Sequence, residues 1–304
     1  MVSAGDYLVR AVAADGQVRA FACRTTTLCE EGRRRHDTWP TASAALGRVL
    51  TGAAILGALL KREERVTLQV LGDGPLGSAV AEADAQGRVR GYVRNPHIDL
   101  PPTAEGKFDV AGAVGRNGSL YVLRDLGLKE PYRGSVPLVS GEIAEDLTYY
   151  FARSEQTPSA VALGVLVERD QSVRAAGGYL VQLLPGADPR LAGELERAVT
   201  RTGQVSSLVD AGCGPEEILS ALLSSLGWKE LGRLPLMYQC RCQRERLGRV
   251  LTALGPQELE ELSQKPEGAE LVCRFCGERY LFSPGELVEL ADRARGGGEA
   301  GETH

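Results

Sequence analysis

Hydrophobic and polar residues alternate along much of the first 184 residues, with the period of two that is typical of β-strands. The alternation predicts strands within residues 5–30, a meander of three strands from Val66 to Val93, and a hairpin from Val161 to Leu184. Helical spacing interrupts it twice, from Pro40 to about Leu60 and from about Glu142 to Ser154, where Ser140 is the predicted cap. We therefore expect an α+β fold, in which residues 1–184 form a mixed β-sheet domain with packed helices.

The pattern changes after Pro185-Gly186. Asp188-Pro189 and Pro215 each resemble the start of a short helix, with a proline suited to the first turn. Their apolar faces are narrow: Leu191, Leu195 and Val199 in one helix, and Ile218 and Leu222 in the other. Helices this short need an outside surface for stability. We therefore interpret residues 185–232 as a metastable helical linker.

Cysteines dominate the chemistry of the following segment. Cys240 and Cys242 form a C-x-C pair, and Cys273 and Cys276 form a C-x-x-C pair. Two close thiol pairs supply the four soft donors that a tetrahedral zinc ion prefers, so we predict one Zn²⁺ per chain. The C-x-C spacing is tighter than in most structural zinc sites, and its sulfurs could also oxidise to each other. A closed structural site and a redox sensor both remain open at this point.

Arginines surround both pairs. Cationic neighbours lower the pKa of a thiol, and so does a bound metal, so we expect all four sulfurs to be thiolates at neutral pH. These arginines are Arg241, Arg244, Arg246, Arg249, Arg274 and Arg279. The predicted zinc domain, residues 233–294, has few large apolar residues, and a metal supplies the missing stability in domains of this size. Its last helix is predicted to start with the capping box of Ser283 and Glu286. Residues 295–304, rich in Gly and Glu, are expected to form a disordered tail.

Composition restricts the remaining possibilities. The net charge of −5 provides no overall field that would attract nucleic acid or an anionic membrane. The first ten residues lack the pattern of a signal peptide, and seven cysteines with a metal-like cluster favour a reducing, cytoplasmic location. Cys23 and Cys29 could form a second metal site with His36, but we expect them to be small core residues, and Cys213 to have a solvent-side or packing role. The G-x-G-x-x-G run Gly72–Gly77 leads into an alternating strand, so it predicts a hairpin turn rather than a nucleotide site.

Taken together, several segments resemble the heat shock protein 33 family of redox-regulated 33 kDa chaperonins over nearly the whole chain. The resemblance rests on the two cysteine pairs at the family's spacing and on four further segments: Gly72–Gly77, Val89–Val93, Tyr150–Gln156 and Ala176–Pro185. Gln243 departs from the family, in which Ser usually follows C-x-C, but it does not occupy a ligand position.

The resemblance implies an ATP-independent holdase with no catalytic residues, and so no enzyme. Its reduced form would hold zinc on Cys240, Cys242, Cys273 and Cys276 and be inactive. Oxidation would form disulfides, release zinc and unfold the linker, and the exposed surface would bind unfolded or oxidatively damaged client proteins under oxidative stress. The close spacing predicts pairing of neighbours, Cys240 with Cys242 and Cys273 with Cys276. A homodimer of the oxidised form is also compatible with the resemblance, whereas nucleic acid and membranes are not expected partners.

Two other functional classes remain open. A zinc-containing nucleic-acid-binding protein would use the arginines near the cysteines on phosphates, but acidic residues roughly balance them. A thiol oxidoreductase would use Cys273 and Cys276 catalytically, but no thioredoxin-like β-α-β pattern surrounds them. Salt-dependent binding of nucleic acid would favour the first class, and turnover in a disulfide-reduction assay would favour the second.

Overall fold

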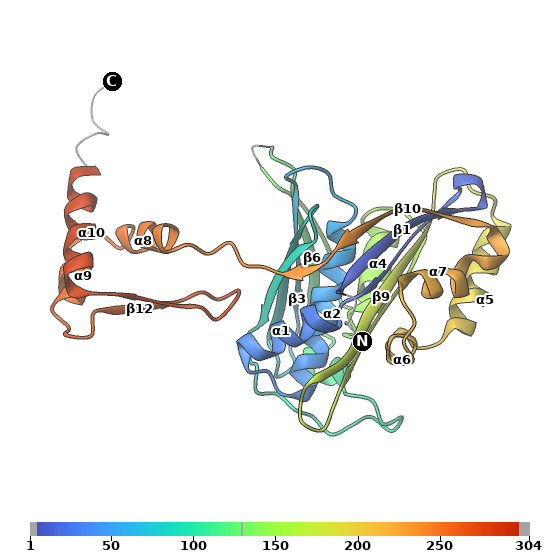
Figure 1. Ribbon diagram of the computed structural model, residues 1–304, viewed down its shortest axis with the longest axis horizontal. Coiled ribbons are helices and arrows are strands. Elements are labelled where there is room, and N and C mark those ends of the chain that lie inside the picture. The colour runs from blue at the N-terminus through green and yellow to red at the C-terminus, as the bar shows by residue number, and fades with distance from the viewer. Residues whose placement is uncertain (1–4, 129, 298–304) are drawn as a thin grey trace. The chain divides into compact units, whose positions relative to one another are not determined.

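The computed structural model of the chain describes residues 5–128 and 130–297, and it divides into two compact units after Gln239 (Figure 1). The predicted boundary between linker and zinc domain, at residues 232 and 233, falls inside the strand β10 (Trp228–Pro235). That strand pairs with the first strand of the chain, so a tertiary contact carries the first unit seven residues further than the sequence pattern indicated.

Two β-sheets build the first unit. Sheet A is antiparallel, in the order β10-β1-β2-β9-β8, and comprises β1 (Tyr7–Ala13), β2 (Val18–Arg24), β8 (Ser159–Val167), β9 (Val173–Leu183) and β10. Sheet B has the order β11-β5-β4-β3-β6-β7 and comprises β3 (Arg65–Leu71), β4 (Ser78–Asp84), β5 (Arg88–Val93), β6 (Ser119–Asp125), β7 (Tyr132–Pro137) and β11 (Met237–Tyr238). Only β11 joins its neighbour in parallel, so sheet B is mixed.

The helix α2 (Pro40–Gly57) forms the centre of the first unit and contacts strands of both sheets. Every residue from Thr41 to Gly57 except Arg48 is buried, as its uncharged sequence predicts. The glycines permit this close packing: a Cβ atom at Gly52 would lie only 2.9 Å from the Leu147 side chain. The prediction of a helix from Pro40 is thus confirmed, and the helix holds the two sheets together.

The prediction of strands through residue 30 is wrong at its end, because α1 (Thr26–His36) is a helix. Its cap comes from outside the segment: the backbone N–H of Leu28 donates to the Asp6 carboxylate over 2.6 Å. A carboxylate beside the first turn stabilises a helix by accepting hydrogen bonds from its unpaired N–H groups. Because Asp6 lies 22 residues away in the sequence, local periodicity does not reveal this start.

Burial also makes Asp6 sensitive to pH, since it raises the pKa of this carboxyl to about 6 from an ordinary 3.8. The folded protein therefore keeps a proton that the unfolded chain loses above about pH 4, so this group weakens the fold as pH rises from 4 to 6. We expect wild type to gain up to about 3 kcal/mol relative to Asp6→Asn as pH falls through that range. Urea unfolding of both proteins checks this, and a difference that does not vary with pH would contradict it.

The helix α4 (Ala144–Arg153) begins by a different cap from the one predicted. The fully buried Asp146, rather than Ser140, accepts hydrogen bonds from the N–H groups of Val139, Ser140 and Ile143, at 2.7–3.0 Å.

The short helix α3 (Val110–Val114) meets the glycine turn between β3 and β4. There the N–H of Gly74 donates to the Val114 carbonyl at 2.9 Å, so the hairpin-turn prediction is confirmed and this amide does not face a phosphate.

Three short helices cover the face of sheet A opposite α2: α5 (Arg190–Thr202), α6 (Val205–Asp210) and α7 (Pro215–Leu223), called the linker helices below (Figure 1). Single turns of 3₁₀ helix lie at Ala14–Gly16 and Ser224–Leu226. Buried side chains from the helices and the sheet form one apolar layer, called the outer cluster: Val9, Ala11, Ala13, Val18, Ala20, Ala22, Ala175, Tyr179, Val181, Leu191, Leu195, Val205, Val209, Ile218, Leu219, Leu222 and Leu223. The predicted faces Leu191/Leu195 and Ile218/Leu222 are therefore buried against a sheet.

The second unit is small. It comprises α8 (Arg244–Thr252), α9 (Pro256–Ser263), the hairpin of β12 (Ala269–Val272) and β13 (Arg279–Phe282), and α10 (Pro284–Gly297). Among its described residues, six form the buried apolar core: Leu251, Leu259, Phe282, Leu287, Leu290 and Ala291. The predicted capping box is confirmed, because the N–H of Ser283 donates to Glu286 at 2.8 Å. The helix α10 reaches Gly297, which corrects the predicted tail at its start, whereas residues 298–304 lie outside the described part.

Candidate metal centre

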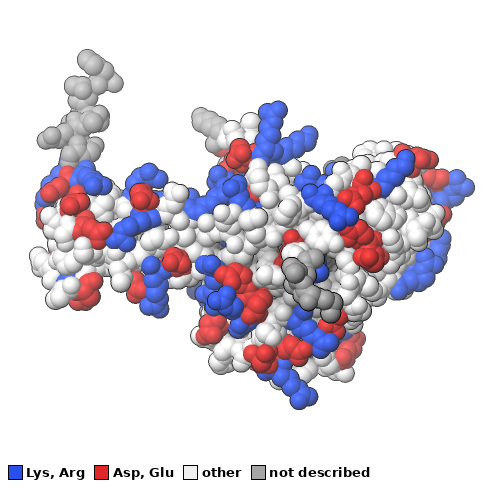
Figure 2. All heavy atoms as spheres, viewed as in Figure 1, with Lys and Arg blue, Asp and Glu red and all other residues white. Residues whose placement is uncertain are grey.

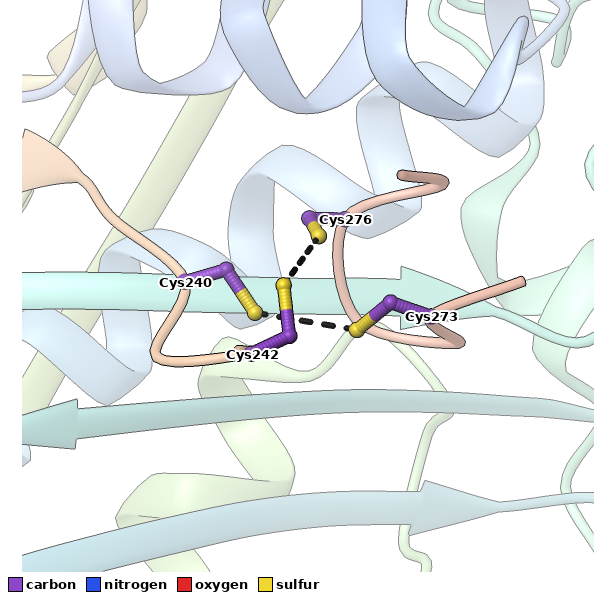
Figure 3. A group of neighbouring side chains, drawn as sticks. All are labelled: Cys240, Cys242, Cys273 and Cys276. Atoms are coloured by element: carbon purple, nitrogen blue, oxygen red, sulfur yellow. Dashed lines mark hydrogen bonds between the residues drawn. The ribbon is translucent and has the colours of Figure 1, made fainter. Parts of the chain in front are cut away.

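Two loops of the second unit bring the four predicted cysteines together. Cys240 and Cys242, the first knuckle, precede α8, and Cys273 and Cys276, the second knuckle, form the tight turn between β12 and β13. That turn closes by a hydrogen bond of 2.8 Å from the N–H of Gly277 to the carbonyl of Cys273. All four Sγ atoms lie within 4.8 Å of one another and converge on one point (Figure 3).

The sulfur positions fit a zinc ion. A Zn–S bond of about 2.3 Å in a tetrahedron requires sulfurs about 3.8 Å apart. The Sγ atoms of Cys240 and Cys273 are 3.7 Å apart, and those of Cys242 and Cys276 are 3.4 Å apart (Figure 3). Four soft donors at these separations would hold Zn²⁺ without a fifth ligand, as closed structural sites do. In the described part of the chain, no other group of three or more His, Cys, Asp or Glu side chains converges in this way.

These distances also bear on disulfide pairing. Each cysteine of the first knuckle has a sulfur of the second knuckle within 3.7 Å. Proximity in the folded unit therefore does not by itself select the neighbour in sequence. The predicted pairing within each knuckle depends on the short loop between its cysteines, which becomes decisive once the folded geometry is lost. It remains a prediction.

The electrostatics of the centre differ from the expectation that flanking arginines keep the sulfurs as thiolates. Burial raises the pKa of the Cys242 and Cys276 thiols. The guanidinium group of Arg244 points elsewhere: it forms an ion pair of 2.6 Å with Glu286 and lies 4.5 Å from the centre of the Phe282 ring. Arg279 likewise pairs with Glu270 at 3.1 Å. A metal cation bound among the sulfurs would therefore be the main factor that lowers the pKa of these thiols and stabilises them as thiolates.

Sequence reasoning missed one side chain at this centre. The hydroxyl group of Tyr280, on β13, lies 3.2 Å from Cys242 Sγ and donates a hydrogen bond to it. The two residues are 38 positions apart, and only the strand pairing of the second knuckle brings them together, so no spacing motif indicates the contact. A hydrogen bond to a ligating sulfur withdraws electron density from it and orients it.

Replacing Tyr280 with Phe is therefore expected to leave zinc binding intact but to accelerate zinc loss under limiting peroxide. One lost hydrogen bond of about 1.4 kcal/mol corresponds to an increase of up to about tenfold in the rate. A chromophoric zinc chelator reports the rate directly, and Tyr132→Phe is the matched control, because Tyr132 is an exposed residue of β7 in the first unit. Equal rates in the two variants would contradict a role of Tyr280 at the sulfur.

The remaining cysteines are placed as predicted. Cys23 and Cys29 are buried in the core of the first unit, where burial raises the pKa of the Cys29 thiol to about 12. His36 does not join them in a cluster; its Nε2 lies 3.3 Å from the hydroxyl of Tyr238. Cys213 is half-buried in the loop between α6 and α7. These thiols therefore show no metal-binding arrangement within the described residues.

Two further observations concern the surface. On the face in Figure 2, acidic and basic side chains are interspersed, and the arginines of α1 pair with Glu30 and Glu31. No helix among the described residues combines the length and the apolar character that crossing a membrane requires.

Comparison with known proteins gives one consistent result. A profile of the Hsp33 protein family matches residues 6–283. A protein of Symbiobacterium thermophilum named 33 kDa chaperonin is 55% identical over 286 residues, which cover 94% of this chain and 97% of the relative. Another of that name, from Halalkalibacterium halodurans, is 49% identical over 290 residues, which cover 95% and 100%. The crystal structure of the Thermotoga maritima 33 kDa chaperonin, described as a heat shock protein 33 homolog, aligns with a TM-score of 0.89 at 39% identity, over 96% of this chain and 100% of that one. The chain belongs to the Hsp33 family.

Proposed function

We propose that this protein is a redox-regulated, ATP-independent holdase chaperone that binds unfolding proteins and prevents their aggregation. The observation that carries the proposal is the convergence of four cysteine sulfurs, from two loops, in a unit whose core has only six buried residues. Such a unit depends on its metal, and its metal depends on reduced sulfurs. The relatives named 33 kDa chaperonin support the chaperone assignment.

In the reduced protein, Cys240, Cys242, Cys273 and Cys276 would hold one zinc ion. When bound, the zinc supplies a cross-link between the two knuckles, which are thirty residues apart in the sequence. The Tyr280 hydroxyl orients Cys242, and the turn of the second knuckle fixes Cys273 and Cys276. In this state the linker helices cover sheet A, so the apolar side chains of the outer cluster are buried and clients cannot contact them.

Oxidation removes the ligands. In each knuckle, two thiolates give two electrons to a peroxide and form an S–S bond, while the O–O bond breaks and two protons complete two water molecules. The disulfides close loops of only three and four residues, which constrain the unfolded chain little and do not join the knuckles. The second unit then loses its cross-link and unfolds.

Unfolding would spread to the linker helices, which are short and are stabilised mainly by the outer cluster. Their release would expose apolar side chains on the helices and on sheet A together. Unfolded or oxidatively damaged proteins present complementary apolar surface, so they are the expected partners, and a second oxidised copy could bind in the same way. The cytoplasm, where thiols are kept reduced, is the location in which such a switch would report oxidative stress.

The test is aggregation of a heat-denatured client without ATP, measured by light scattering. Peroxide-treated protein is expected to suppress aggregation at near-stoichiometric amounts, while reduced, zinc-loaded protein does not. The matched control is the triple variant Cys23→Ala, Cys29→Ala and Cys213→Ala, which keeps the four clustered cysteines and should still be activated. Equal protection by the reduced and oxidised forms would refute the proposal, and catalytic turnover of a disulfide substrate would favour a thiol oxidoreductase.

A further inference from the structure

One short segment of the first unit closes an edge of both sheets. The strand β10 is the edge strand of sheet A beside β1, and β11 is the edge strand of sheet B beside β5. The ladder of β11 has only two residue pairs, with hydrogen bonds of 3.0 Å from Met237 to Gly87 and 2.9 Å from Gln239 to Val89. The segment follows the linker helices and directly precedes the metal ligand Cys240. In the proposed switch, the linker helices before it and the second unit after it both unfold.

The side chains of β10 hold it weakly. Most of them are exposed, including Leu231 at 65%, and the ladder with β1 has an irregularity between Arg10 and Ala11. One firm side-chain contact is the ion pair of 2.7 Å between Arg233 and Glu216, a residue of α7. Release of the linker helices removes this contact and their share of the packing around Trp228, and it leaves β10 held by its backbone ladder and by Leu234, which packs against the core of the first unit.

We propose that the switch frees β10 together with the linker helices, and that the bared edge of β1 binds an extended apolar segment of the client by β-strand addition. An edge strand offers a row of unpaired N–H and C=O groups, and an unfolded chain has matching groups to pair with them. In the reduced protein β10 occupies this edge, so the protein blocks its own binding site. The inference rests on the proposed function, because only the oxidised state frees the edge.

The register of β10 indicates which client segment fits. Opposite residues of an antiparallel pair share a face of the sheet, so Trp228, Glu230 and Arg233 lie on the face of the outer cluster, opposite Ala13, Ala11 and Val9. Trp228 packs against the outer cluster there. Glu230 and Arg233 place charges beside an apolar surface, where Arg233 forms ion pairs with Glu230 and with Glu216 of α7. A segment with an apolar residue at every second position matches this face better than β10 does.

Hydrogen exchange of the oxidised protein, with and without a heat-denatured client, tests the pairing. Oxidation should expose the outward amides of residues 7–13, while their neighbours in β2 stay protected. Adding client should slow exchange in residues 7–13 by about tenfold or more, the effect of a hydrogen bond of about 1.4 kcal/mol. If adding client slows hydrogen exchange only in β2 and β9, which also contribute to the outer cluster, and not in β1, the inference is wrong.

A locked variant gives a second test. Val12 and Lys229 are directly paired across β1 and β10, and their side chains are partly or fully exposed. The double variant Val12→Cys/Lys229→Cys should form a disulfide on peroxide treatment that keeps β10 in place. We expect it to release zinc at the wild-type rate but to need at least about threefold more protein for equal client protection, a loss comparable to one hydrogen bond of the ladder. Each single variant is the matched control.

The outcomes separate the two proposals. If oxidised wild type does not protect the client, the proposed function fails and this inference fails with it. If oxidised wild type protects the client, and the locked variant protects it equally well while its disulfide between β1 and β10 is shown to be formed, only the inference fails. If residues 7–13 become protected without client, and more so at higher protein concentration, the edge binds a second copy of this chain, which also overturns the inference.

Discussion

Removing the metal from the reduced protein is expected to unfold residues 240–297 while the core strands of the first unit stay protected. The second unit has six buried core residues to offset the ordering of almost sixty residues. In domains of this size the apolar core rarely supplies more than about 3–5 kcal/mol, whereas a structural zinc site provides about 10–16 kcal/mol in small peptides. We therefore expect the unit to have no folded state once the metal is removed.

The measurement is hydrogen exchange during titration with a zinc chelator, at neutral pH and under reducing conditions. Protection in α8, α9 and α10 should disappear together, and that in β2 and β9 should remain. The double variant Cys240→Ser/Cys242→Ser should behave like the chelated protein before any chelator is added, with no bound zinc. Cys213→Ser is the matched control and should bind one zinc per chain. Retained protection in α8 or α10 at full chelation would show that the unit folds without metal.

The sequence made the metal centre predictable because its signal is local. Two cysteine pairs specify donor type and number without reference to the fold, and the structure brings all four sulfurs within 4.8 Å. Tyr280 escaped prediction because its hydrogen bond to Cys242 depends on how the hairpin lies against the first knuckle. The contribution expected from the flanking arginines was misjudged for a similar reason, since a neighbour in sequence such as Arg244 directs its charge to other partners.

The same contrast applies to the fold. Alternating strands and the apolar helix α2 were predicted from their own residues, because each buries a face that its sequence displays. The start of α1 was not, because its cap is the distant Asp6. The strand β10 was missed because its exposed side chains give no alternating pattern, and its partner is the first strand of the chain. Long-range pairing, rather than local propensity, decides such elements.

Placing a charge inside the outer cluster is expected to activate the chaperone without oxidation. Leu222 of α7 is 1% exposed and packs in this layer. Replacing a buried Leu by a small residue costs about 2–5 kcal/mol, and the carboxylate of Leu222→Asp adds an unpaired buried charge. Short helices that depend on this layer have no comparable stability of their own, so the variant should release the linker helices in the reduced state.

The reduced Leu222→Asp protein should therefore suppress client aggregation while still holding one zinc per chain. Hydrogen exchange should show lost protection over residues 190–223 and retained protection in α8 and α10. Ser220→Asp is the matched control, since it adds the same charge to the exposed face of α7 and should stay inactive until oxidised. If Leu222→Asp unfolds its linker helices, keeps its zinc and still fails to protect clients, then the outer cluster is not the surface that binds them. Because zinc content, linker protection and client binding are read separately, this variant distinguishes the exposed surface from the metal centre as the direct cause of activity.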